Sequence, residues 1–165
     1  MEKLREYARE YGIELSEEQL NQFNTYYEML IEKNKVMNLT AITEKEDVMV
    51  KHFADSIAVA SCYDFVNQEV SLIDVGTGAG FPGIPLKIAF PNLKVTLLDS
   101  LNKRVSFLQE VIDELRLEEI QAVRRIDVYM TNRDIFHYLS LNCIWSRIKC
   151  HQRRRSHLFN RKTFF

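Results

Sequence analysis

The chain has 165 residues, of which 46% are hydrophobic, and a formal net charge of −1, which is ordinary for a globular domain with one core. It contains no apolar run of about 18 residues and no signal-peptide pattern at the N-terminus, so we expect neither a membrane span nor secretion. The three cysteines are odd in number and widely spaced, which argues against a disulfide framework or a metal site and favours the reducing cytoplasm.

The near-neutral total conceals a change of composition after Val123. Residues 1–123 hold 12 Lys and Arg against 21 Asp and Glu, whereas residues 124–165 hold 10 against 2. All five glycines and all three prolines also lie before residue 124. Such a break is typical of a domain boundary, a basic tail or a change in the origin of the sequence.

The N-terminal segment predicts two helices before residue 34. A short helix over residues 2–11 ends near Gly12. Ser16 then begins the sequence Ser-Glu-Glu-Gln, a capping box with Gln19 as the partner, and the helix that follows runs to about Lys33. Its apolar face is formed by Leu20, Phe23, Tyr27 and Leu30.

A third helix is expected over about residues 44–63, after a connection at 34–43. Val48, His52, Asp55 and Val59 share one side of it. His52 and Asp55 are three residues apart, so they could form a catalytic pair. The interpretation we favour is a hydrogen-bonded packing pair between subdomains.

The next segment predicts a βαβαβ unit. The elements are strands at 70–75, 94–99 and 120–123 and helices at about 83–90 and 101–117. Parallel strands with right-handed crossovers follow from this order. Beyond Val123 the pattern weakens: 135–145 fits helix or strand equally well, and 147–165 has no clear periodicity.

A glycine-rich turn follows the first expected strand, with the sequence Asp-Val-Gly-Thr-Gly-Ala-Gly-Phe-Pro-Gly over residues 74–83. Glycine allows positive φ angles and close approach of a ligand to the backbone. Between a strand and a helix, such a turn directs backbone N–H groups at a ligand. Asp99, at the end of the next strand, can accept both hydrogen bonds of a ribose diol. This order of features favours a ligand site over a flexible turn.

The choice of ligand lies between a nicotinamide dinucleotide and S-adenosylmethionine. Residues 78–83 match the dinucleotide fingerprint G-x-G-x-x-G. However, Asp74 precedes the first glycine by two residues, which suits a cofactor with a positive amino group and a sulfonium. Pro82 and Pro85 also distort the helix start on which a pyrophosphate would rest. These features favour S-adenosylmethionine.

Three separated motifs resemble the small-subunit ribosomal RNA guanine-N7 methyltransferase G family, also called glucose-inhibited division protein B. They are Asn-Leu-Thr-Ala-Ile at 38–42, Lys-His-Phe-Ala-Asp-Ser at 51–56, and the glycine-rich turn together with Leu-Leu-Asp-Ser-Leu-Asn-Lys-Arg at 97–104. The resemblance covers about residues 4–123. It implies an α/β fold, a Rossmann-like S-adenosylmethionine-dependent methyltransferase sheet with an N-terminal helical cap, here truncated after the third strand.

The same resemblance implies a cytoplasmic bacterial enzyme that methylates N7 of a guanine in 16S rRNA, with the small ribosomal subunit as partner. Gly76 and Phe81 would contact the cofactor, and Asp99 would lie near the ribose. The residues shaping the turn would be Asp74, Gly78 and Gly80. Phe81 could instead fill the core, but the resemblance favours the cofactor.

The expected chemistry needs no dedicated general base, because guanine N7 has an exposed lone pair and no proton to lose. Alignment and exclusion of water can therefore supply most of the catalysis, and we assign no catalytic residue. The target base must be unpaired or extruded to reach the pocket. Lys103 and Arg104 could touch phosphate, although a solvated helix end is the simpler interpretation.

The family pattern ends at Val123. Members of the family continue with a Gly-Arg-Ala-Glu-like segment that contacts the cofactor, and later with a Ser-Arg-Ala segment that carries an active-site arginine. This chain has Arg-Arg-Ile-Asp at 124–127, and Ser-Arg-Ile at 146–148 is best explained as a chance match. The tail could be an RNA-binding arm, a divergent end of the domain or out-of-frame translation. The simultaneous loss of glycine, proline and acids favours the third, which the coding DNA in other frames would test.

We therefore divide the chain into an N-terminal helical cap (1–66), a partial methyltransferase domain (67–123) and a basic tail of doubtful origin (124–165). The function predicted first is methyl transfer to 16S rRNA. The alternatives are a catalytically inactive remnant that keeps part of the cofactor pocket, and a methyltransferase with another substrate.

Overall fold

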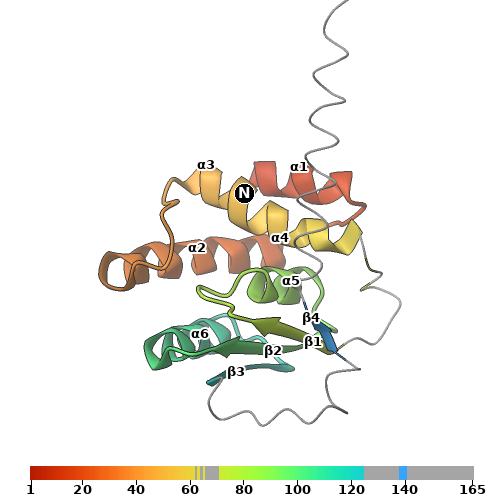
Figure 1. Cartoon of the computed structure of the whole chain (residues 1–165). Helices are drawn as coiled ribbons and strands as arrows, with labels where there is room; N and C mark the ends of the chain where they lie inside the picture. The colour runs from red at the N-terminus through yellow and green to blue at the C-terminus, as the bar shows by residue number, and fades with distance from the viewer. Residues whose placement is uncertain (62, 64, 66–70, 125–137, 141–165) are drawn as a thin grey trace, which may run out of the picture.

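The structure, a computed structural model, describes residues 1–61, 63, 65, 71–124 and 138–140 (Figure 1). The predictions made for the rest of the tail, including the match at 146–148 and its out-of-frame origin, lie outside the described residues. No helix in the described part is both long enough and apolar enough to span a bilayer.

Two N-terminal helices, one short and one long, confirm the first two predictions. They are α1 (Glu2–Glu10) and α2 (Glu17–Met37). The predicted capping box begins α2: the Ser16 hydroxyl accepts from the Gln19 amide at 3.1 Å, and the Ser16 amide donates to the Gln19 side chain at 2.8 Å. The helix continues past its predicted end near Lys33 and stops at Asn38, which adopts a left-handed conformation with φ of 47°.

The third predicted helix is a run of four short segments. They are α3 (Lys45–Val48), the π-helical η1 (Met49–Ala54), α4 (Asp55–Ile57) and the 3₁₀ segment η2 (Ala58–Ser61). The helical span was predicted, but the π segment was not. Its wider turn changes which side chains share a face, and such segments often occur at functional sites.

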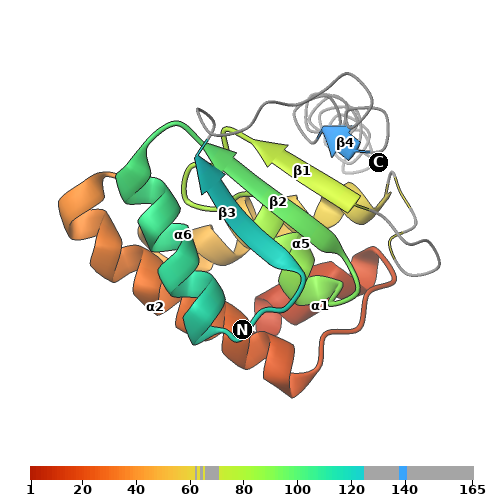
Figure 2. The same cartoon turned by 90° about the horizontal axis from the view of Figure 1, so that it is seen from below.

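The second half forms a parallel sheet of four strands in the order β3-β2-β1-β4. Its elements are β1 (Ser71–Val75), α5 (Gly83–Ala89), β2 (Lys94–Asp99), α6 (Asn102–Glu114), β3 (Ile120–Arg124) and β4 (Tyr138–Ser140). The βαβαβ prediction is confirmed, and the short β4 adds a strand beyond the three predicted. Figure 2 shows β3, β2 and β1 side by side, with the helices behind them.

The strand order places a topological switch point at β1. The chain builds β2 and β3 on one side of β1 and returns to place β4 on the other. In open α/β sheets, ligands bind outside the carboxyl ends of the strands at such a point. The glycine-rich turn leaves β1 at this position.

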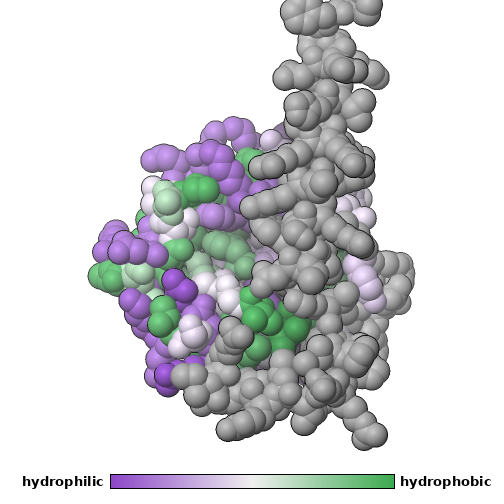
Figure 3. Space-filling view, in the orientation of Figure 1, coloured by the Kyte–Doolittle hydropathy of each residue, from purple (hydrophilic) through white to green (hydrophobic). Residues whose placement is uncertain are grey.

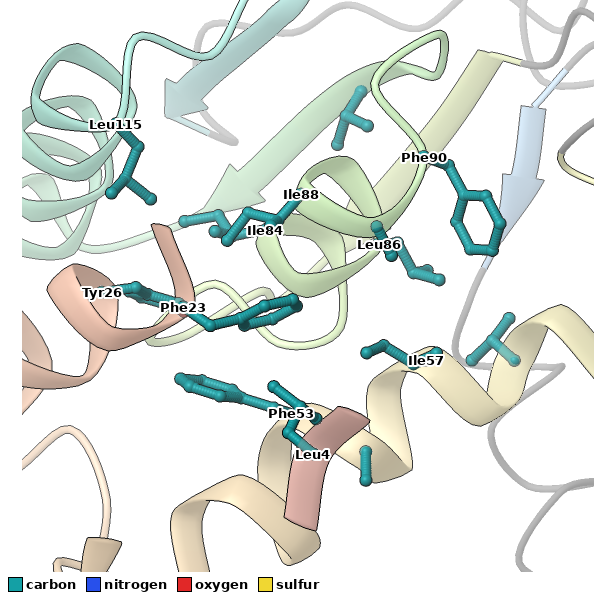
Figure 4. Packing of buried hydrophobic residues seen from close by; sticks show 14 of the residues in the cluster. Leu4, Phe23, Tyr26, Phe53, Ile57, Ile84, Leu86, Ile88, Phe90 and Leu115 are labelled. Atoms are coloured by element: carbon teal, nitrogen blue, oxygen red, sulfur yellow. The ribbon is translucent and has the colours of Figure 1, made fainter. Parts of the chain in front are cut away.

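One hydrophobic core joins the helical cap to the sheet. In Figure 4, Phe23 and Tyr26 of α2 and Phe53 of η1 face Ile84 of α5. The buried face of α2 contains Tyr26 and not the predicted Tyr27, which is only partly buried. Figure 3 shows hydrophilic residues along the upper helices of that view and a group of hydrophobic residues lower down, at the level of the sheet.

Candidate functional site at the carboxyl ends of β1 and β2

The turn after β1 is fixed by main-chain hydrogen bonds to β2. The amides of Gly76 and Thr77 both donate to the Leu98 carbonyl, at 2.8 and 3.1 Å. The Gly80 amide donates to the Thr77 carbonyl at 2.9 Å, which closes a tight turn before α5. Three glycines of the turn take positive φ angles, which other residues adopt only with strain: Gly76, Gly78 and Gly80.

Asp74 joins the two ends of this turn. Its Oδ2 accepts from the Thr77 hydroxyl at 2.7 Å and from the amide of Gly83, the first residue of α5, at 3.0 Å. The side chain is 2% exposed. Its pKa is raised from 3.8 to about 6, mainly by burial and to a smaller extent by the nearby charge of Asp99, while its two hydrogen bonds act in the opposite direction. Asp74 therefore holds the two ends of the turn together and places a carboxylate next to it.

Asp99 connects the end of β2 to the same turn. Its Oδ2 accepts from the Gly78 amide at 3.0 Å, and its Oδ1 accepts from the Leu101 amide at 2.9 Å. Arg104, near the start of α6, places Nη1 3.5 Å from Oδ2. No side chain caps α6 at its N-cap residue Leu101, whose amide is bound instead by the Asp99 carboxylate.

The glycines of the turn fall into two groups. Apart from its chain neighbours, a Cβ built on Gly76 or Gly78 would meet no atom of the described residues within 4 Å, so the backbone there borders open space in this part of the chain. A Cβ on Gly80 would come within 2.6 Å of Ile84 and 2.7 Å of the Tyr26 hydroxyl. One on Gly83 would come within 2.3 Å of Leu97. The first pair leaves room for a ligand, and the second pair is required by close packing.

Aromatic side chains from the cap adjoin the turn. The His52 ring stacks on Phe81, with centroids 4.5 Å apart and planes at 12°. His52 Nε2 also lies 2.8 Å from the Thr40 hydroxyl, and burial lowers the pKa of His52 below its ordinary value, which favours the neutral ring. Phe81 further contacts Tyr26, with centroids 5.7 Å apart, while remaining partly buried.

The structure thus brings all six predicted cofactor residues to one edge of the sheet: Asp74, Gly76, Gly78, Gly80, Phe81 and Asp99. Sequence reasoning missed Tyr26, whose hydroxyl reaches the turn from the cap, and Thr40, whose hydroxyl lies beside His52. A tyrosine on the apolar face of α2 was the available signal, but the helical spacing selected its neighbour Tyr27.

Comparison with known proteins agrees with this geometry. Residues 19–140 match the sequence model of a family described as rRNA small subunit methyltransferase G. Proteins named ribosomal RNA small subunit methyltransferase G from Staphylococcus aureus strains JH9, N315 and Newman are each 54% identical to the chain over 123 residues. That alignment covers 74% of the chain and 51% of each relative, so the chain spans about half their length. The family match continues past Val123, where the sequence resemblance was expected to end, and includes β4.

Proposed function

This chain belongs to the rRNA small subunit methyltransferase G family, and from that premise we propose that the turn after β1 binds S-adenosylmethionine for methylation of guanine N7 in 16S rRNA. The observation that carries the proposal is the open backbone at Gly76 and Gly78, between two buried carboxylates on adjacent parallel strands. We propose the six residues of this edge as the cofactor-binding set and the cytoplasmic small ribosomal subunit as the partner.

The residues present fit this cofactor in shape. Gly76 and Gly78 have no side chain, and no other described residue comes within 4 Å of where a Cβ would lie, apart from their chain neighbours. A ligand can therefore approach the peptide backbone closely there. Asp99 Oδ1 accepts only the Leu101 amide among its described contacts. A carboxylate oxygen has two acceptor sites, so Oδ1 can accept a ribose hydroxyl without giving up its bond to the chain.

The residues also fit in charge. Asp99 lies close enough to Asp74 for its charge to raise the pKa of Asp74, so two carboxylates adjoin this edge, with Arg104 3.5 Å from one of them. A ligand carrying a positive amino group and a sulfonium relieves that repulsion, whereas the pyrophosphate of a dinucleotide would increase it. This difference supports S-adenosylmethionine over a nicotinamide cofactor.

The chain's own contribution to catalysis is binding and alignment. When bound, S-adenosylmethionine supplies an electrophilic methyl group, and guanine N7 offers a lone pair with no proton to remove. A general base is therefore unnecessary, which agrees with the position of His52: its Nε2 lies at the Thr40 hydroxyl and its ring stacks on Phe81. The Phe81 ring, held by His52, can shield one side of the turn from water.

Calorimetric titration of the full chain with S-adenosylmethionine tests the binding proposal, with nicotinamide dinucleotide as the comparison ligand. A methyl-transfer assay on unmethylated small ribosomal subunits tests the reaction. Binding with transfer supports the enzyme, and binding without transfer supports the alternative of an inactive remnant. Transfer to another substrate supports the third hypothesis. Absence of S-adenosylmethionine binding, with uptake of the dinucleotide, would refute the proposal.

A further inference from the structure

Helix α2 presents three side-chain donors to backbone carbonyls of the sheet half of the molecule. Gln19 Nε2 donates to the Ile88 carbonyl at 2.7 Å, at the end of α5, and Gln22 Nε2 donates to the Leu115 carbonyl at 3.0 Å, at the end of α6. The third donor, the Tyr26 hydroxyl, bonds the Ala79 carbonyl at 2.6 Å. Of these three contacts, the one from Tyr26 reaches the glycine-rich turn.

The Tyr26 ring is held firmly in place. It is 0% exposed and stacks on Phe53, with centroids 5.2 Å apart and planes at 14°. Burial, and then the charge of Asp74, raise the pKa of the Tyr26 phenol well above its ordinary value. The hydroxyl consequently keeps its proton and remains a donor.

The bonded carbonyl belongs to the peptide unit that joins Ala79 to Gly80. Gly80 has a φ of 107°, and a Cβ there would lie 2.7 Å from the Tyr26 hydroxyl, so the hydroxyl occupies the space that the glycine leaves. Glycine has broad conformational freedom, so a turn containing several glycines populates many backbone states unless contacts restrict it. The Tyr26 bond restricts it at its centre.

We propose that Tyr26 is a positioning residue for the cofactor turn: by holding the Ala79 carbonyl, its hydroxyl keeps the backbone of residues 76–80 in the conformation that binds ligand. The inference rests on the proposed function, since it assigns the bond a role in binding S-adenosylmethionine. If only a fraction of the molecules holds the turn in its binding conformation, the apparent affinity equals the intrinsic affinity multiplied by that fraction.

The test is Tyr26→Phe, which removes the hydroxyl and leaves the stacked ring. Titration of the full chain with S-adenosylmethionine should show an affinity about tenfold weaker than wild type, which is the loss expected when the turn without this bond is competent in about a tenth of the molecules. Hydrogen exchange of the free protein should show faster exchange of the amides of residues 76–80, with the strands unchanged. This second measurement needs no ligand.

Gln22→Met is the matched control. It also removes one donor from α2 to a backbone carbonyl, but that carbonyl lies at the end of α6. It should lower the urea midpoint and leave cofactor affinity within about twofold of wild type. A second control measures the cofactor affinity of wild type in urea, at the concentration that lowers its free energy of unfolding to that of Tyr26→Phe. This control separates the effect of lower stability from the effect of the missing hydroxyl.

Equal affinities for wild type and Tyr26→Phe, or an unchanged exchange pattern in the turn, would overturn this inference while the proposed function stands. An equal loss of affinity in Gln22→Met would also overturn it, since destabilisation alone would then explain the effect. No binding by wild type would instead refute the proposed function, and the role of Tyr26 in ligand binding with it.

Discussion

Replacing Gly76 by alanine separates backbone strain from loss of ligand space. Gly76 has a φ of 77°, and no atom lies within 4 Å of where its Cβ would be. A residue with a Cβ in the left-handed region costs about 1–2 kcal/mol. We therefore expect Gly76→Ala to fold, with stability lowered by about that amount.

The effect on cofactor binding should be much larger than this strain. The new methyl group would occupy the space through which a ligand approaches the backbone, so the ligand would have to move away from the amides of the turn. We expect affinity for S-adenosylmethionine to fall by at least about 100-fold, which corresponds to about 2.8 kcal/mol of binding free energy.

Gly12 supplies the matched control. Its φ is 73°, and a Cβ there would likewise meet nothing within 4 Å, but it lies in the connection between α1 and α2. Gly12→Ala should lower stability about as much as Gly76→Ala and leave cofactor affinity unchanged. Urea unfolding and calorimetric titration of both variants provide the comparison. Wild-type affinity in Gly76→Ala would refute the reasoning, because the space above the turn would then have no role in binding.

Two further predictions concern the stability of the turn. Gly80→Ala should lower the free energy of unfolding by about 3 kcal/mol in urea titrations, since its Cβ would come within 2.6 Å of Ile84 in a strained conformation; a loss below about 1 kcal/mol would contradict the packing described here. Burial raises the Asp74 pKa from 3.8 to about 6, so between these values the folded state keeps a proton that the unfolded state has lost. Relative to Asp74→Asn, stability should thus fall by about 3 kcal/mol in total as pH rises from about 3 to about 7, with about 2 kcal/mol of that loss between pH 4 and 6. His52, whose pKa is lowered, contributes the opposite slope in both proteins and cancels in the difference; parallel curves would refute the assignment to Asp74.

The features predicted from the sequence depend on local chemistry. The capping box at Ser16 and Gln19 needs residues three apart on one chain segment, and the structure confirms it. The glycine turn and Asp99 meet because parallel neighbouring strands carry their carboxyl ends to the same edge, which the βαβ order already dictates. Alternation of strand and helix was therefore enough to bring these residues together.

The features that were missed depend on contacts between distant segments. Spacings of three or four residues both fit a helical face, so the sequence could not decide between Tyr26 and Tyr27. Tyr26 is the buried tyrosine because its ring stacks on Phe53 and its hydroxyl bonds the Ala79 carbonyl, which lies 53 residues away in the chain. The π-helical segment was missed as well, and its His52 contacts Phe81 and Thr40, which are 29 and 12 residues away in the chain.

The division at residue 66 describes where the chain changes from helices to a sheet. Hydrogen bonds and a shared hydrophobic core nevertheless connect the two parts. Carbonyls at the ends of α5 and α6 and within the glycine turn take their donors from α2. Without those donors these groups would have to bond water instead, and the apolar side of α5 that packs on Phe23 and Phe53 would be exposed. A segment limited to 67–123 would therefore keep the glycine motif and its bonds to Leu98, Asp74 and Asp99, but it would lack the Tyr26 bond and the apolar cover of α5. If the turn binds a cofactor as proposed, we therefore expect the binding unit to include the cap, because one of the bonds that hold the turn comes from Tyr26 of α2.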